Sequence, residues 1–161
     1  MNNPYAPPES DLTPVQEHGD TYTPTWFDAR GRIGRLRYLV YATVPVILVL
    51  VSLLGGGRVL AERPLVLGVL AMSMGLALAV VLAVMTLRRL RDLAQPGWWA
   101  LILLLAPINL LLVGFLLVRP GDAGPNRYGP PPSENTTLVA AGTWMVMLMA
   151  LTGLVWVFDI G

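Results

Sequence analysis

The chain has 161 residues, of which 55% are apolar and only 13% are charged, and its mean hydropathy is +0.61. A soluble domain carries about 25% charged residues, so this chain has too little polar surface to cover itself in water. The net charge of +1 is too small to indicate a nucleic-acid partner, and the absence of cysteine excludes disulfides, thiolate nucleophiles and cysteine-based metal sites.

Residues 1–25 are rich in proline and polar side chains and show no apolar period, so we expect a disordered tail. Near its start lies the sequence NPYAPP, which is a candidate docking motif for a protein partner in the manner of proline-rich ligands. The alternative is an inert leader. The residues of the motif are Asn3, Pro4, Tyr5, Ala6, Pro7 and Pro8.

Four stretches without charged residues follow the tail, and each is long enough to cross a membrane. They contain 20, 24, 26 and 24 residues, and a membrane-spanning helix needs roughly 20. Only a helix or a closed barrel satisfies its backbone in lipid. We therefore expect an all-α, polytopic membrane bundle of about four hydrophobic spans. The spans are expected at about 38–56, 64–87, 97–118 and 137–158.

The second expected span carries a stripe of small residues spaced four apart, which would let another helix approach closely in lipid. We expect the partner to be a neighbouring span, and the alternative is a second copy of the chain. The residues of the stripe are Ala71, Gly75, Ala79 and Ala83.

The third expected span is interrupted at its centre by APIN, residues 106–109. We expect Pro107 to kink a helix that still crosses the membrane; the alternative is a re-entrant hairpin of two apolar halves. A full span places the C-terminus in the cytoplasm, and a hairpin places it outside. Asn109 is expected to bond to the backbone that Pro107 frees or to a facing helix, with a substrate contact as the other possibility.

Arginines gather before the first span, in RGRIGRLR, and after the second, in RRLRDL. Seven arginines lie in these two clusters and four in the other loops, which predicts a cytoplasmic N-terminus; a hairpin at 97–118 would change the ratio to nine against two. The clusters could fix topology alone or also bind anionic lipid head groups, with two tryptophans at head-group depth. The residues concerned are Arg30, Arg32, Arg35, Arg37, Arg88, Arg89, Arg91, Trp98 and Trp99.

Three segments together resemble the DUF805 family of small bacterial inner-membrane proteins: GRIGRLRYL at 31–39, RRLRDLAQPGWWALILLLAPINLLLVGFLL at 88–117 and RPGDAGPNRYGPPP at 119–132. In that family the arginine loop often reads RRLHDL, so Arg91 stands where the family tends to have histidine. Family members commonly stop soon after a GPNRYGP-like segment. The resemblance implies an inner-membrane location and a DUF805-like membrane domain at 26–132, followed by an appended transmembrane helix at 133–161; it implies no mechanism.

The expected spans contain no acidic, basic or histidine side chain, and the sequence shows no set of residues for acid–base, nucleophilic or metal chemistry. We therefore expect no cofactor and no enzymatic activity. The leading hypothesis is a non-enzymatic interaction or scaffold protein of the bacterial inner membrane, with lipid and protein partners and possible homo-oligomers. The alternative is a small channel, lipid-handling or transport subunit, with the break at Pro107 and Asn109 lining a polar path.

Overall fold

The structure is a computed structural model that describes residues 21–26 and 28–159, with side chains as far as Thr152. Its described part is all-helical, with five helices and only two isolated β-bridges. The candidate docking motif at residues 3–8 lies outside the described residues.

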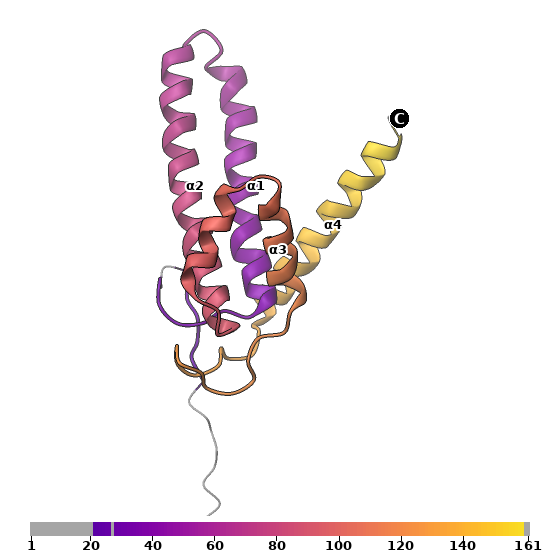
Figure 1. The fold of residues 1–161 in the computed structure, drawn as a ribbon. Coiled ribbons are helices and arrows are strands. Elements are labelled where there is room, and N and C mark those ends of the chain that lie inside the picture. The colour runs from indigo at the N-terminus through magenta and orange to yellow at the C-terminus, as the bar shows by residue number, and fades with distance from the viewer. Residues whose placement is uncertain (1–20, 27, 160–161) are drawn as a thin grey trace, which may run out of the picture.

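Two long antiparallel helices form the frame of the molecule (Figure 1). Helix α1 runs over Arg35–Val59 and helix α2 over Pro64–Asp92, and both are long and apolar enough to cross a membrane. Pro64 stands at the first position of α2, where its missing N–H costs no hydrogen bond. Helix α2 continues past the expected end of the second span into the arginine cluster. The first two expected spans are therefore confirmed as two long apolar helices.

The expected continuous third span is not formed, and this prediction has to be corrected. Residues 97–118 form two short helices, η1 over Gly97–Leu104 and α3 over Ile108–Val118. They run up and back down beside the lower half of α1 and α2 (Figure 1). A 3-10 helix of this length rises about 16 Å and α3 rises about 16 Å as well, so each reaches about half of the ~30 Å hydrocarbon layer. The hairpin alternative describes this segment.

The reversal between η1 and α3 follows from the sequence at residues 105–109. Pro107 has no N–H to donate, so the helix cannot continue through it unbroken. The backbone N–H of Asn109 donates to the Leu105 carbonyl at 2.8 Å, and the Asn109 amide reaches the Leu103 carbonyl at 3.5 Å. Asn109 thus bonds to backbone across the turn, as expected. Trp99 of η1 packs on Phe115 of α3 with ring centroids 5.8 Å apart, which joins the two halves.

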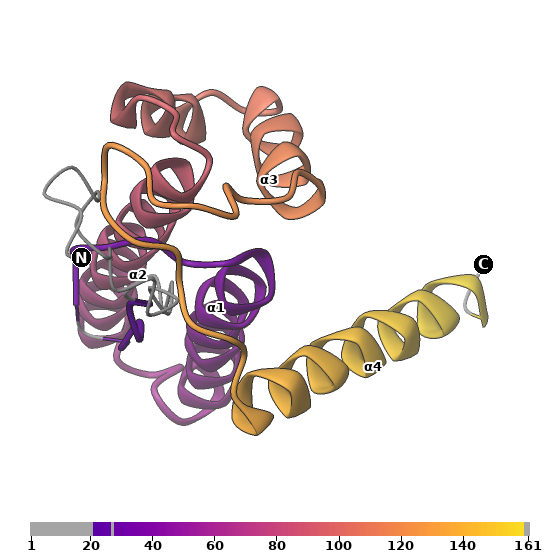
Figure 2. The ribbon, with the colours of Figure 1, turned by 90° about the horizontal axis from the view of Figure 1, so that it is seen from below.

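Helix α4 runs over Thr137–Asp159 and leaves the bundle at an angle (Figures 1 and 2). Within the part whose side chains are described, it contacts α1 near its own beginning, where Val40 lies against Gly142. The side chains beyond this contact, such as Trp144 and Leu148, are exposed. This helix is the most weakly attached element of the fold.

The expected internal packing along the small-residue stripe of α2 is also corrected in part. Ala71 and Ala83 are half-buried, but Gly75 and Ala79 are exposed. No described atom lies within 4 Å of the point where a Cβ on Gly75 would stand. The described part of a single chain therefore brings no helix close to the middle of the stripe.

Candidate functional site: an arginine-clamped polar cap

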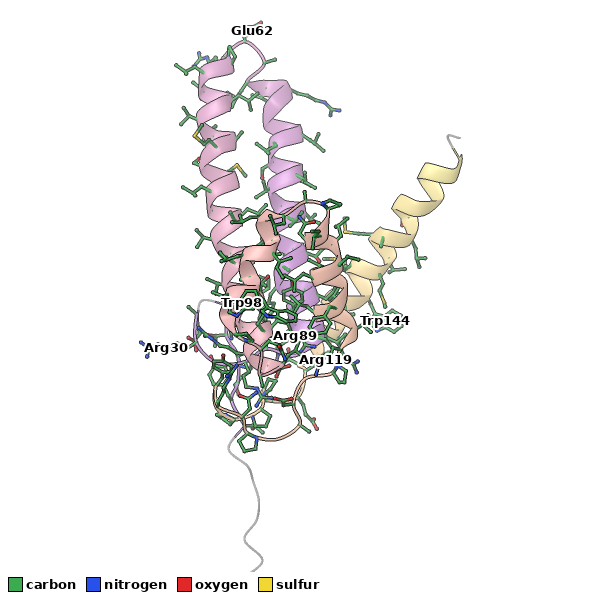
Figure 3. The ribbon with its side chains drawn as sticks, in the orientation of Figure 1. Arg30, Glu62, Arg89, Trp98, Arg119 and Trp144 are labelled. Atoms are coloured by element: carbon green, nitrogen blue, oxygen red, sulfur yellow. The ribbon has the colours of Figure 1, made fainter. Side chains whose placement is uncertain are left out.

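All the charged loops except one gather at the same end of the bundle. We call this end the polar cap and define it as residues 21–26 and 28–37, 88–96 and 119–136. Figure 3 shows Arg30, Arg89 and Arg119 at this end, and Glu62, in the α1–α2 turn, at the other. The cap holds nine arginines, and the α1–α2 end holds Arg58 and Arg63. This is the distribution expected for the hairpin alternative.

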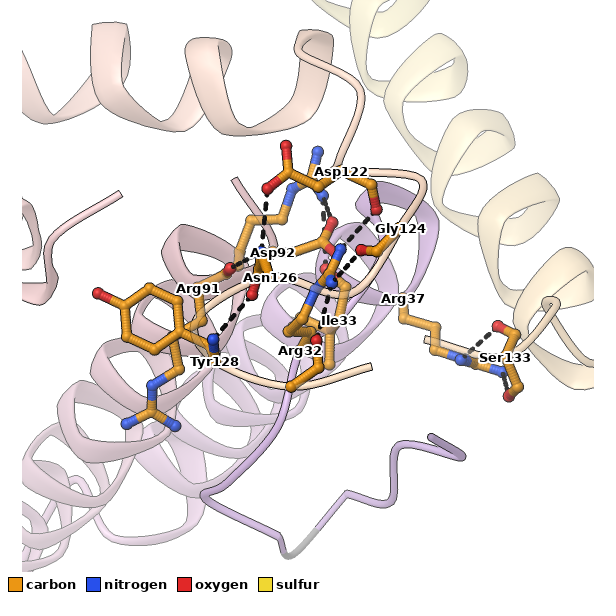
Figure 4. A network of polar contacts seen from close by, with 12 residues as sticks. Arg32, Ile33, Arg37, Arg91, Asp92, Asp122, Gly124, Asn126, Tyr128 and Ser133 are labelled. Carbon is orange, nitrogen blue, oxygen red and sulfur yellow. Dashed lines mark hydrogen bonds and ion pairs between the residues drawn. The ribbon is translucent and has the colours of Figure 1, made fainter. Parts of the chain in front are cut away.

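Asp92, the last residue of α2, lies at the centre of the cap between two buried arginines (Figure 4). Arg32 donates to Asp92 through Nε at 3.2 Å, and Arg89 donates to the other carboxylate oxygen. All three side chains are at most 2% exposed. A buried carboxylate held by two guanidiniums has its charge balanced locally, which is the condition under which such charges are tolerated.

Both guanidiniums also donate to backbone carbonyls of distant segments. Arg32 donates through Nη1 to Gly124 at 2.8 Å and Gly129 at 3.1 Å, and through Nη2 to Asp122. Each of these carbonyls belongs to the loop between α3 and α4, which contains no helix of its own. Arg32 therefore holds this loop in one shape.

Arg89 binds the C-terminal end of the η1–α3 hairpin. Its Nε donates to the Leu116 carbonyl at 2.8 Å and its Nη2 donates to the Arg119 carbonyl, so it caps the last turn of α3. The last carbonyls of a helix lack partners within the helix, and a cation there also opposes the negative end of the helix dipole. This contact fixes the end of α3 beside the end of α2.

The C-terminus of α2 is capped in turn by the segment 126–128. Asn126 donates to the Arg91 carbonyl at 3.0 Å, Arg127 to the Ala94 carbonyl at 2.8 Å, and the Tyr128 hydroxyl to the Gln95 carbonyl at 3.2 Å. Three consecutive side chains thus satisfy carbonyls at one helix end. The GPNRYGP sequence is therefore a cap for α2 and more than a run of turns.

A third buried arginine, Arg37, fixes the segment that leads into α4. It donates to the Ser133 carbonyl at 2.9 Å and to the Glu134 carbonyl at 2.6 Å (Figure 4). Residues 131–133 also pair with the N-terminal segment, because the Tyr22 N–H donates to Pro131 at 3.0 Å and the Ser133 N–H donates to Tyr22 at 2.8 Å. These two bonds hold the N-terminal segment against the α3–α4 loop.

Arg88 differs from its neighbours because it is buried but poorly bonded. Its Nη1 donates to the Thr25 carbonyl at 2.8 Å. Its Nε and Nη2 have no hydrogen-bond partner among the described residues, although the side chain is fully buried. Buried donors without acceptors cost about 1–3 kcal/mol, so Arg88 is a weak point of the cap.

The N-terminal segment carries its own polar pair, Tyr22 and Asp28. The Tyr22 hydroxyl donates to the Asp28 carboxylate, whose other oxygen accepts the Arg30 N–H at 2.8 Å. These two bonds, with a smaller contribution from the charge of Arg88, hold the pKa of Asp28 below its ordinary value. Burial, and then the bond to Asp28, raises the pKa of Tyr22.

The arginines and tryptophans that the sequence assigns to the lipid surface divide into two groups in the structure. Arg30, Arg35 and Trp98 are exposed, and Arg91 and Trp99 are half-buried. The other four arginines are buried at the cap interior, so the expected position at lipid head groups is corrected for them. Those four are Arg32, Arg37, Arg88 and Arg89.

The sequence reasoning did not single out Asp92, Asn126 or Tyr128 as site residues. One signal was present: Asp92 is the only acid in RRLRD and follows Arg89 by three residues, which is the spacing of an ion pair on a helix. Its pairing with Arg32, sixty residues earlier, has no local signal.

A cleft of about 390 Å³ opens in the cap between the start of α1 and the two ends of the α3–α4 loop. Arg35, Pro120, Pro132 and Glu134 are among the residues that line it. The cleft has charged groups of both signs on its wall, together with rigid proline rings. It is a feature of the cap that could receive another molecule.

The described residues form an all-helical fold with an arginine-clamped polar end and two helices that are long and apolar enough to cross a membrane. A family model described as "Protein of unknown function (DUF805)" matches residues 26–130, which is more than half of the chain. The chain therefore belongs to the DUF805 family, as the resemblance predicts. The match includes the hairpin and the GPNRYGP segment and ends before α4 begins. No curated protein and no solved structure matches the chain.

Proposed function

We propose that the chain is a multi-pass protein of the bacterial inner membrane whose polar cap lies in the cytoplasm. The apolar windows of α1 and α2 have mean hydropathies of 2.3 and 2.6. The nine arginines of the cap, against two in the α1–α2 turn, favour a cytoplasmic cap under the positive-inside rule. If α4 also crosses while the η1–α3 hairpin does not, the chain crosses three times and its C-terminus lies outside.

We further propose that the protein is a non-enzymatic interaction or scaffold component, with the cap as its docking face. The observation that carries this proposal is the clamping of an irregular loop by Arg32, Arg37 and Arg89, which together donate to carbonyls from residue 116 to residue 134. A surface loop held in one shape loses little entropy when a partner binds. The buried charges of the chain thus hold one surface in a fixed shape.

The cleft of about 390 Å³ is the proposed point of contact with a protein partner, and the tail is the proposed second contact. The described chain begins at residue 21, and Tyr22 pairs with the chain at Pro132, which lines the cleft. The tail with the NPYAPP motif therefore joins the fold beside the cleft. An extended proline-rich segment at this place could extend the surface that the partner contacts.

Lipid head groups are the second class of proposed partner. The exposed side chains of Arg30 and Arg35 and the exposed indole of Trp98 lie at the level where the helices leave the expected bilayer. Each such arginine would contribute about 1 kcal/mol of attraction to an anionic surface.

The docking proposal is tested by photo-cross-linking in growing bacterial cells. A photoreactive amino acid replaces Ala123, which lines the cleft, or Glu62, which lies at the opposite end as the matched control. We expect an adduct of one discrete mass from position 123 and none from position 62. A mass of twice the chain would identify a second copy as the partner.

The same experiment in a chain lacking residues 2–20 tests the tail and leaves the bonds of Tyr22 in place. We expect the adduct at position 123 to weaken or disappear. The absence of any discrete adduct from position 123 in the full chain would contradict docking at the cleft, and an unchanged adduct after the deletion would contradict the role of the tail.

A further inference from the structure

A second cavity, of about 250 Å³, lies inside the bundle between α1, α2 and the η1–α3 hairpin. Its wall is almost entirely apolar and is partly open. The lining residues from α1 run from Tyr38 to Val46, which corresponds to about 12 Å along the helix axis. The cavity is separate from the cleft of the cap, because the two share no lining residue.

Three hydroxyl-bearing side chains line this cavity, Tyr38, Thr43 and Thr86. Tyr38 and Thr86 are buried, with one hydrogen bond between their hydroxyl groups. The Tyr38 hydroxyl and Thr86 Oγ1 are 3.3 Å apart, and either one can donate. Both side chains are at most 3% exposed. Two hydroxyls carry two hydrogens and one of these forms the bond, so the other has no acceptor among the described residues. The cavity therefore offers one hydroxyl hydrogen that can still donate a hydrogen bond, in otherwise apolar surroundings.

The depth of the hydroxyl pair in the proposed membrane position is set by its neighbours in the sequence. Tyr38 follows the buried Arg37 directly, and Thr86 precedes Arg88 by two residues. The pair thus lies just beneath the arginine layer of the cap, where head groups meet acyl chains. From there the cavity continues toward Val46 and Leu82, in the direction of the bilayer centre.

We propose that this cavity binds one acyl chain of a membrane phospholipid, whose ester carbonyl accepts the free hydroxyl hydrogen of the Tyr38–Thr86 pair. Water is disfavoured because an apolar cavity offers it too few polar partners. A phospholipid meets each feature of the site: it has an acceptor at the depth of the hydroxyls, a chain that extends inward from it, and a supply from the surrounding bilayer. The inference needs the membrane position of α1 and α2, but it needs no protein partner.

The test uses the full-length protein, purified in detergent, and measures by native mass spectrometry the fraction that retains one phospholipid. Ester-linked phosphatidylethanolamine is compared with its ether-linked analogue, which lacks the carbonyl. We expect the ester lipid to be retained about two- to tenfold more strongly, which is the size of one hydrogen bond. This preference should disappear in the double variant Tyr38→Phe/Thr86→Val, which removes both hydroxyl hydrogens, because each single variant leaves one hydroxyl free to donate. Thr143→Val, which removes a buried hydroxyl on α4, should preserve it.

The volume of the cavity is tested with a second pair of variants. Ala42→Phe places a ring in the cavity, and Ala79→Phe adds the same ring on the exposed face of α2. We expect Ala42→Phe to abolish lipid retention and Ala79→Phe to leave it unchanged. Equal retention in the two variants, or an ester preference that survives both hydroxyl substitutions, would overturn the proposal. Thermal unfolding of each variant shows whether it is folded, and if Ala42→Phe is not, the nearly isosteric double variant Tyr38→Phe/Thr86→Val decides.

Discussion

Individual side chains in the cap differ in what they do even where the sequence repeats the same residue. Arg88 and Arg89 are neighbours on α2, and both are fully buried. Among the described residues, Arg89 bonds to Asp92, Ile33, Leu116 and Arg119, whereas Arg88 has one partner and two nitrogens without one. Burial alone therefore does not identify the arginine that stabilises the fold; the number of bonded nitrogens does.

Replacement of each arginine by methionine separates these two roles. Arg89→Met leaves the Asp92 carboxylate with one fewer cation and the end of α3 uncapped, and we expect a loss of about 3–5 kcal/mol in unfolding free energy. Arg88→Met removes two unpartnered donors and is expected to be neutral or stabilising. Thermal unfolding in detergent measures both. A large destabilisation by Arg88→Met would show that its burial contributes to the fold through contacts other than hydrogen bonds.

The pKa of Asp28 depends most on one hydrogen bond, which the Tyr22 hydroxyl donates. Tyr22→Phe removes the hydrogen bond that contributes most to the lowered pKa of Asp28, so we expect that pKa to rise toward its ordinary value. A lowered pKa in the folded state means that Asp28 stabilises the fold above its ordinary pKa and that this contribution is lost as the pH falls through the folded-state value. Carboxyl carbon chemical shifts in a pH titration measure the change. Tyr128→Phe, in another part of the cap, is the control and should leave the pKa of Asp28 where it is.

The elements of the molecule hold together through their ends more than through their faces. Helices α2 and α3 and the loop after α3 meet at the cap, where side chains of one segment satisfy the terminal carbonyls of another. Higher up, α1 and α2 present many exposed leucines and valines, as expected of surfaces that face lipid. The loop of residues 119–136 is thus bonded firmly to the helix ends, although none of its residues is fully buried.

Two glycines of this loop test how closely it must approach α2. A Cβ on Gly121 would overlap the Asp92 carboxylate, which Arg32 and Arg89 hold in place. No described atom lies within 4 Å of the corresponding point on Gly124. We expect Gly121→Ala to destabilise the fold by about 1–3 kcal/mol through overpacking and Gly124→Ala to have little effect. Unfolding midpoints of the two variants give the comparison, and equal midpoints would contradict the close approach.

The whole molecule is asymmetric along the axis of its two long helices. One end carries nine arginines and every buried charge in the described residues, and the other is a short turn with Glu62 (Figure 3). The hairpin of η1 and α3 enters from the cap and returns to it. In the proposed membrane position, every later residue therefore lies on the opposite side from the one that a full span would give. The location of the C-terminus therefore depends on one proline-containing turn.

Reporter fusions measure this directly. A fusion after residue 122 and a fusion after residue 161 are expected to report opposite sides of the membrane, the first cytoplasmic and the second external, because α4 is the only helix between them. A fusion after residue 60 should agree with the one at 161. A cytoplasmic signal at 161 together with an external signal at 122 would show that the segment 97–118 crosses the bilayer after all.

Much of the architecture could be predicted from composition and charge spacing. The long charge-free stretches predict α1 and α2 because lipid leaves a chain no other way to satisfy its backbone, and the arginine clusters predict the polar end. Residues 97–118 satisfy the same length criterion and still form a hairpin. The criterion counts apolar residues. It contains no information on where the missing N–H of Pro107 makes the chain reverse direction.

The sequence by itself determined the two long apolar helices of this protein, its family and the end at which its charges gather, because these depend on sums over neighbouring residues. The tertiary structure alone decided which arginines are buried, that Asp92 joins Arg32 to Arg89, and that the third apolar stretch turns back. These outcomes depend on contacts between residues that are up to about a hundred positions apart in the chain, such as Arg32 and Gly129. Such contacts leave no local pattern, because a guanidinium that donates to a distant carbonyl looks in the sequence like one that points to water.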